Sequence, residues 1–220
     1  MSLTLYGAIL SPYVRKIRIQ LAEQLIPHDM VQQAPFQQPD WYFEISPLGR
    51  IPALQDGDLA LADSSVIAQY LQDSRGGAPL FGATPEQAAR VRWLEKYADY
   101  ELGALATHTV FANRILKPLT GGSCDDAAVQ QALEKLAPLF DYLEAQLGEQ
   151  HFFLGEQFSM ADIAVVSQLI NLAHAGELID EYRWPGLSSL LSRVTARSSV
   201  SQLLPDEHQL VAKLTVNRKP

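Results

Sequence analysis

The chain has 220 residues, enough for one large domain or two smaller ones, and its net charge of −8 with scattered basic residues argues against nucleic-acid binding. Its single cysteine, Cys124, excludes an internal disulfide and a cysteine-based metal cluster, and we expect no metal site. Because no apolar run approaches the roughly 18 residues of a membrane span and residues 1–25 lack the pattern of a signal peptide, we expect a cytoplasmic protein that does not enter membranes.

The N-terminal stretch predicts a strand, a tight break and a helix. Alternating apolar residues over 3–9 are typical of a strand, and helical spacing begins after Ser11, with Pro12 at the first helical position. Ser11 would then lie at a helix N-terminus, where backbone N–H groups and the helix dipole favour an anion and lower the pKa of a thiolate. The alternative is that Ser11 serves only as an N-cap.

The next segments complete a small α/β pattern. Residues 28–32 predict a second strand, and Pro52 begins an apolar strand that turns at 56–58, which is a hairpin signal. Asp63 is predicted to cap the following helix. The apolar face of that helix is formed by Val66, Ile67, Tyr70 and Leu71. We therefore expect a first domain over residues 1–77.

Everything after this domain is predicted to be helical. Thr84 begins a capping box with Pro at the first helical position, and its long helix should run to about Leu116. Ser123 with Asp126 is predicted to open the next helix, which Pro138 should bend.

A second strong helix start lies in the C-terminal half. Ser159 and Asp162 form a predicted capping box with a structural role, and the helix that follows is apolar almost all round, so it should be the buried centre of the domain. We expect an all-helical domain over 84–205 and a polar tail over 206–220 that lies on the surface.

With these elements in place, the sequence resembles the cytosolic glutathione S-transferase family. The resemblance covers nearly the whole chain, in the family's order and spacing. Four features carry it: Ser11-Pro12-Tyr13 with Arg15, the run Gly49-Arg50-Ile51-Pro52-Ala53-Leu54, Asp63-Ser64, and Ser159-Met160-Ala161-Asp162. It implies a thioredoxin-like α/β N-terminal domain followed by an all-α domain, and a bacterial member with a serine-type motif similar to those of the tau and theta classes.

The resemblance implies a glutathione site formed by Arg50, Ile51, Pro52, Asp63 and Ser64. The Ile51–Pro52 bond would be cis, with the Ile51 N–H and C=O open to an extended peptide. Asp63 and Ser64 would hold the γ-glutamyl end, since a carboxylate suits its ammonium, and a hydroxyl with helix N–H groups suits its carboxylate. Arg50 would meet the glycyl carboxylate. Ordinary capping for Asp63 and Ser64, and a solvated turn charge for Arg50, are the alternatives.

The same resemblance makes Ser11 the catalytic residue. Its hydroxyl would donate a hydrogen bond to the glutathione sulfur and stabilise the thiolate. Omega and glutaredoxin-like members carry a cysteine there, and this chain does not, which argues against mixed-disulfide chemistry through a protein cysteine. Tyr6, on the first strand, is the alternative donor.

The second substrate is expected to be a small hydrophobic electrophile, bound in a pocket between the domains along the long helix from Thr84. Its candidate lining residues are Tyr13, Tyr97, Tyr100, His108 and Phe111. An aromatic stripe that belongs to the core is the alternative. We therefore expect a homodimeric detoxification enzyme that conjugates glutathione. A non-catalytic adaptor on the same fold, and a glutathione-dependent disulfide or peroxide reductase without a protein cysteine, are the other hypotheses.

Overall fold

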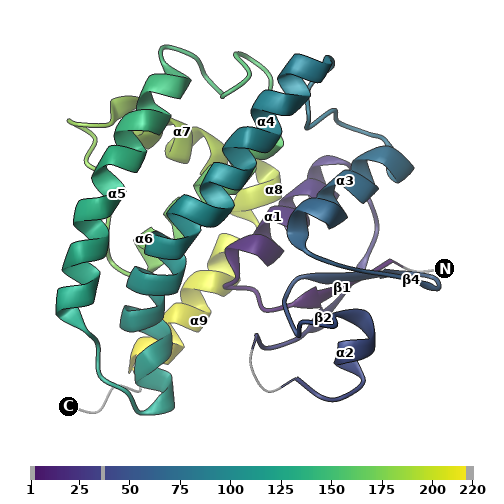
Figure 1. The fold of residues 1–220 in the computed structure, drawn as a ribbon, viewed down its shortest axis with the longest axis horizontal. Coiled ribbons are helices and arrows are strands. Elements are labelled where there is room, and N and C mark those ends of the chain that lie inside the picture. The colour runs from purple at the N-terminus through teal and green to yellow at the C-terminus, as the bar shows by residue number, and fades with distance from the viewer. Residues whose placement is uncertain (1–2, 36–37, 217–220) are drawn as a thin grey trace. The chain divides into compact units, whose positions relative to one another are not determined.

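The chain divides into two compact units, Met1–Leu80 and Phe81–Pro220, in a computed structural model that describes residues 3–35 and 38–216 (Figure 1). The first unit is α/β and the second is helical, as the sequence predicts. No helix within the described ranges combines the length and the hydropathy needed to span a bilayer.

The first unit is built on a four-stranded mixed sheet in the order β2-β1-β3-β4. Its strands are β1 (Leu3–Gly7), β2 (Asp29–Gln32), β3 (Ala53–Asp56) and β4 (Leu59–Ala62). Strand β1 runs parallel to β2 and antiparallel to β3, and β3 runs antiparallel to β4. Leu5 and Leu54 are paired across β1 and β3 and are at most 1% exposed, so one face of the sheet is core.

Three helices complete this unit, namely α1 (Pro12–Glu23), α2 (Tyr42–Ile45) and α3 (Ser64–Arg75). Helix α1 approaches β1 so closely that a Cβ on Gly7 would lie 2.3 Å from Val14 Cγ2. Helices α1 and α3 lie side by side (Figure 1), and the Gln20 side chain donates a 2.8 Å hydrogen bond to the Ala68 carbonyl. Val66 is an exception to the predicted apolar face of α3, because it is 50% exposed.

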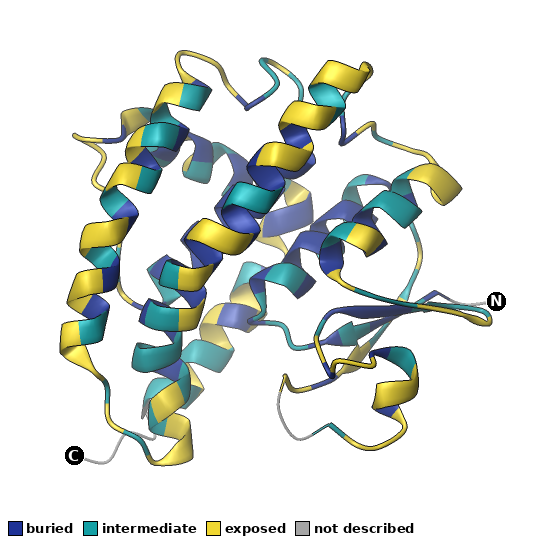
Figure 2. Cartoon of the chain, in the orientation of Figure 1, coloured by how far each residue is buried: buried dark blue, intermediate teal, exposed yellow. Residues whose placement is uncertain are grey.

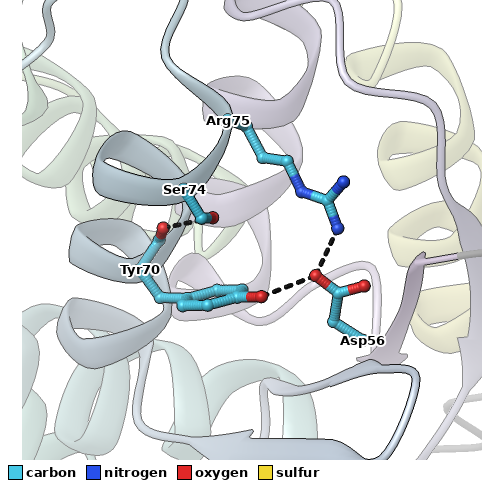
Figure 3. Close-up of polar contacts among 4 residues, drawn as sticks. All are labelled: Asp56, Tyr70, Ser74 and Arg75. Carbon is cyan, nitrogen blue, oxygen red and sulfur yellow. Dashed lines mark hydrogen bonds and ion pairs between the residues drawn. The ribbon is translucent and has the colours of Figure 1, made fainter.

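Asp56, at the end of β3, joins the hairpin to α3 (Figure 3). Its carboxylate accepts a 2.6 Å hydrogen bond from the Tyr70 hydroxyl and another from the Arg75 guanidinium. These two hydrogen bonds hold the pKa of Asp56 below its usual value, and the same carboxylate raises the pKa of Tyr70. The contacts fix α3 against the hairpin from which it emerges.

The second unit is a set of helices packed around α6. The helices are α4 (Pro85–Tyr97), the π-helix η1 (Ala98–Leu116), the 3₁₀ turn η2 (Lys117–Thr120), α5 (Asp126–Leu147), α6 (Met160–His174), α7 (Pro185–Thr195), α8 (Ser198–Ser201) and α9 (Leu204–Val216). Helices α4 and α5 each carry buried and exposed residues along their length (Figure 2), whereas every residue of α6 from Met160 to Leu172 is buried. The predicted central helix is thereby confirmed.

The long helix from Thr84 runs to Leu116 as predicted, and its geometry changes from α to π at Ala98. Two other expectations for this unit need correction. Helix α5 is capped by Asp125, whose carboxylate accepts a 3.0 Å hydrogen bond from Ala128 N–H, and not by Ser123. Both positions carry cap-forming residue types, so the local sequence alone does not choose between them.

The second correction concerns the tail expected over 206–220, which is helix α9 as far as Val216; residues 217–220 lie outside the described residues. Polar residues dominate the segment, but Glu207 is fully buried and its carboxylate lies 2.9 Å from His174 Nε2. This tertiary contact, which the polar composition does not reveal, ties α9 to α6.

The capping box of α6 is present as predicted. The fully buried Asp162 carboxylate accepts hydrogen bonds from Phe153 N–H (2.9 Å), Ser159 N–H (2.8 Å) and the Ser159 hydroxyl (2.7 Å). Burial raises the pKa of Asp162 to about 6, although the three hydrogen bonds favour the ionised form.

We expect Asp162→Asn to lower the free energy of unfolding by about 1–3 kcal/mol, because an amide N–H₂ would face a buried donor. The folded state binds more protons than the unfolded state between about pH 4 and about pH 6, so the stability that Asp162 contributes decreases as the pH rises through this range. The loss in the variant should therefore be largest near pH 4. Urea unfolding across this range measures it.

Asp125→Asn is the matched control, since Asn caps a helix as well as Asp and Asp125 is exposed. It should change stability little at any pH. An equal loss for Asp162→Asn at low and neutral pH would contradict the raised pKa.

Candidate functional site

The strand register brings the three predicted site segments to one edge of the sheet. Ala53, the first residue of β3, is paired with Tyr6 near the end of β1 and with Ala62 at the end of β4. Because β3 is antiparallel to both neighbours, the segment after β1, the segment before β3 and the segment after β4 emerge at the same edge. These segments hold Ser11, Ile51-Pro52 and Asp63-Ser64.

Ser11 is the N-cap of α1, with φ −73° and ψ 123°, and it is half-buried. Its Oγ accepts a 3.3 Å hydrogen bond from Val14 N–H. This contact uses a lone pair of the hydroxyl and leaves its hydrogen available to an acceptor in front of the helix. The cap and the predicted donor role are therefore compatible.

Tyr6 is differently placed. Its hydroxyl donates a 2.9 Å hydrogen bond to the Gln55 side-chain carbonyl, and its ring packs against Trp41 and Tyr42 at centroid distances of 5.9 and 6.1 Å. The hydroxyl hydrogen of Tyr6 is thus already used in a hydrogen bond to a residue of β3. Tyr13, the second residue of α1, is half-buried.

The segment before β3 is held by two buried hydroxyl side chains that the sequence analysis did not single out. Tyr42 and Ser46 are both 0% exposed, and each donates a 2.9 Å hydrogen bond to the Arg50 carbonyl. Ser46 Oγ also accepts a 3.0 Å hydrogen bond from Arg50 N–H. The Arg50 side chain is exposed, and the Ile51–Pro52 peptide is cis, as expected.

Asp63 and Ser64 form the start of α3. The Asp63 carboxylate accepts hydrogen bonds from Ser65 N–H (2.9 Å) and Val66 N–H (3.2 Å), so the predicted cap is confirmed. Ser64 is 5% exposed, and Lys16 Nζ, from α1, lies 3.5 Å from Ser65 Oγ. The helix N-terminus and this ammonium together favour an anion.

Asp63 also has an uncommon backbone conformation for a residue with a Cβ, at φ +92° and ψ 120°. Such strain is retained where the surroundings over-determine the conformation. Here the backbone must turn from β4 into α3 while the carboxylate reaches back to cap the helix.

The residues predicted on the long helix occupy different environments within the second unit. Tyr97 stacks on Tyr142 at 4.7 Å, and Tyr100 is 63% exposed with Lys96 Nζ 5.2 Å above its ring. Phe111 is 2% exposed and belongs to the core. Desolvation lowers the pKa of His108, which favours its neutral form.

Among the described residues, no group of three or more His, Cys, Asp or Glu side chains is arranged to hold a metal ion. The groups that converge are hydroxyls, backbone N–H groups and helix N-termini, which suit an anionic peptide and a thiolate.

Comparison with known proteins identifies the family. The model for the glutathione S-transferase N-terminal domain matches residues 5–79, and the model for the C-terminal domain matches residues 126–194. Glutathione S-transferase 3 of Zea mays is 35% identical over 167 residues, which cover 73% of this chain and 73% of the relative. The chain belongs to the glutathione S-transferase family; it is an enzyme of the transferase class, and glutathione is the co-substrate that this membership implies.

Other relatives widen the comparison. FtsZ-localized protein A of Caulobacter vibrioides is 25% identical over 183 residues, covering 80% of this chain and 79% of that protein. Among solved structures, a glutathione S-transferase from Rhodospirillum rubrum has a TM-score of 0.85 at 24% identity, over 92% of this chain and 91% of that one. Glutathione S-transferase III in its apo form has a TM-score of 0.79 at 28% identity over the whole of both chains. These structures confirm the predicted fold.

We expect Asp63→Ala to lower the free energy of unfolding by about 1 kcal/mol through loss of the cap. The free energy of unfolding of Asp63→Gly should be about 1 kcal/mol higher than that of Asp63→Ala, because glycine adopts a positive φ without a Cβ penalty. Urea unfolding followed by circular dichroism compares the two variants.

The same pair of substitutions at Asp125, an N-cap with an ordinary φ of −95°, provides the control. Glycine caps a helix better than alanine even at Asp125, so the two variants should differ in unfolding free energy at both sites. Only the amount by which this difference is larger at Asp63 reports backbone strain. Equal differences at the two sites would show that the positive φ costs nothing.

Proposed function

We propose that this enzyme conjugates the glutathione thiolate to a small hydrophobic electrophile, with Ser11 as the catalytic residue that stabilises the thiolate. The observation that carries the proposal is the contrast between the two candidate hydroxyls. The Ser11 hydroxyl caps α1 with a lone pair and keeps its hydrogen for an acceptor, whereas the Tyr6 hydroxyl donates to Gln55. This contrast supports the proposal of a serine-type site.

Glutathione would lie along the sheet edge where the three segments meet. Asp63 and Ser64 would hold the γ-glutamyl ammonium and carboxylate at the start of α3, close to Lys16. The Ile51 backbone, next to Pro52, would pair with the cysteinyl peptide. The exposed Arg50 side chain would meet the glycyl carboxylate.

The chemical step follows from these positions. The glutathione thiol loses its proton to solvent, and the Ser11 hydroxyl and the N-terminus of α1 stabilise the resulting thiolate. A sulfur lone pair then forms the C–S bond with the electrophile, which either loses a leaving group with its bonding electrons or takes up a proton after addition. Ser11 forms no covalent bond in this sequence.

The remaining expectations stand as parts of the same proposal. The glutathione-binding domain would comprise residues 1–77 and the helical domain residues 84–205, with electrophile contacts from Tyr13, Tyr97, Tyr100 and His108 and with Phe111 behind them in the core. A homodimer with a cytoplasmic role in detoxification completes the proposal.

A binding protein on the same fold is the second candidate. The similarity to FtsZ-localized protein A favours it, since the name of that relative describes a location and not a reaction. The site hydroxyls and the α3 cap favour the enzyme, because an adaptor has no need of a thiolate site. Glutathione-dependent reduction of disulfides or peroxides would use the same residues, and substrate profiling separates it from conjugation.

We expect bound glutathione to titrate well below the free thiol, whose pKa is about 8.5, when thiolate absorbance is followed against pH. Ser11→Ala should raise the thiolate pKa by about 1–2 units, the size of a lost hydrogen bond to a charged group. Ser74→Ala removes another hydroxyl of the same unit, one that donates to the Tyr70 carbonyl, and should leave the titration unchanged.

The outcomes separate the hypotheses. An unchanged thiolate pKa in Ser11→Ala, with glutathione still bound, would move the catalytic role to Tyr6 or to backbone donors. A wild-type protein that binds no glutathione would make the adaptor hypothesis the leading one.

A further inference from the structure

The Arg50 carbonyl is an unusual acceptor because two fully buried hydroxyls donate to it. The donors are Tyr42, in α2, and Ser46, directly after α2, each at 2.9 Å. We propose that Tyr42 and Ser46 are positioning residues that aim the backbone N–H of Ile51 at the cysteinyl peptide of glutathione. This inference rests on the proposed function and adds two residues to it.

The direction of the Ile51 N–H follows from the geometry of one peptide unit. The Arg50 C=O and the Ile51 N–H belong to the same planar peptide group, and the Ile51–Pro52 bond is the cis peptide of this segment, so the group between Arg50 and Ile51 is trans. In a trans peptide the C=O and the N–H point in opposite directions. Two hydrogen bonds that hold the Arg50 oxygen toward α2 therefore hold the Ile51 N–H away from α2.

The Ile51 N–H also remains available to a ligand. No residue that the structure describes forms a backbone hydrogen bond with the N–H or C=O of Ile51. An extended peptide laid along the segment would find a donor and an acceptor there, as at the edge of a sheet.

The segment that contains Ile51 is anchored at both ends. Ala53 enters the sheet between Tyr6 and Ala62. On the other side, the Gly49 carbonyl accepts a hydrogen bond from the Gln38 amide, and a Cβ on Gly49 would lie 2.9 Å from Phe43 Cε1. With Arg50 fixed between these anchors, the Ile51 peptide has little freedom left, and a preorganised donor binds its ligand more tightly.

The Tyr42 hydroxyl stays a hydrogen-bond donor, and its ring is held in place. Burial raises the pKa of Tyr42 to about 12, so its phenol stays protonated over the whole working range of a neutral-pH enzyme. The Tyr42 ring packs edge-on against Tyr6 and Trp41. Phenylalanine at this position would keep the ring contacts and lose only the hydroxyl, which makes Tyr42→Phe a clean test.

The experiment measures binding of S-methylglutathione, an unreactive probe, to the full chain by calorimetry. We expect Tyr42→Phe and Ser46→Ala each to raise the Kd about 3- to 10-fold, the size of one hydrogen bond. The matched control is Tyr70→Phe, which removes a phenol hydroxyl of the same unit that bonds Asp56 and should leave the Kd unchanged.

A spectroscopic readout distinguishes positioning from general destabilisation. In ¹H–¹⁵N spectra of the wild type, the Ile51 and Ser64 amides should both shift when the probe binds. In Tyr42→Phe the Ile51 shift at saturation should shrink while the Ser64 shift persists. Ser46→Ala, which perturbs the same carbonyl through a different side chain, gives an independent result if either variant folds poorly.

Wild-type Kd and wild-type Ile51 shifts in both variants would overturn the inference and leave the proposed function intact. Equal losses of the Ile51 and Ser64 shifts would also overturn it, because they would indicate a general loss of the site. A wild-type protein that does not bind the probe would overturn the proposed function and this inference with it.

Discussion

The register of β3 between β1 and β4 is the constraint on which the site depends. Ala53 faces Tyr6 on one side and Ala62 on the other, and only this pairing brings the ends of three separate segments to one edge. The register is itself fixed by burial, since Leu5 and Leu54 are paired in the core and a slip of one residue would place one of them on the opposite face. The position of the site is thus set by apolar contacts that contain none of its chemistry.

The N-termini of two helices contribute positive electrostatic potential at the same edge. Helix α1 begins after its N-cap Ser11 and α3 begins after its N-cap Asp63, and each has the positive end of its helix dipole at this first turn. Lys16 is 1% exposed and extends from α1 to Ser65 at the start of α3, which places an ammonium beside the second helix. A ligand with a thiolate and a carboxylate, such as glutathione, has one anionic group for each helix start.

Much of this could be predicted from the sequence because its signals are local. The caps at Ser11, Asp63 and Ser159 depend on hydrogen bonds within two or three residues, and a hairpin turn follows from Asp56-Gly57-Asp58. Two features that the sequence does not predict depend on distant residues. Helix α9 depends on the pair of Glu207 with His174, and the commitment of Tyr6 depends on Gln55, 49 positions away.

Tyr42 and Ser46 show the same limit most clearly. Their segment predicts only a weak helix, and nothing in its pattern marks a tyrosine whose hydroxyl meets a carbonyl eight positions later. The signal appears only when the chain is folded, because it consists of the direction of one peptide group.

In the proposed enzyme, glutathione binding and electrophile choice depend on different parts of the protein. The contacts proposed for glutathione are backbone groups and helix starts, so their geometry is determined by side chains that never touch the ligand, such as Tyr42 and Ser46. Most of the contacts proposed for the electrophile are side chains of α4 and η1, such as the exposed Tyr100. Substitutions on that helical surface would change electrophile choice without moving the glutathione peptide, whereas a change in α2 would act on glutathione binding through the backbone.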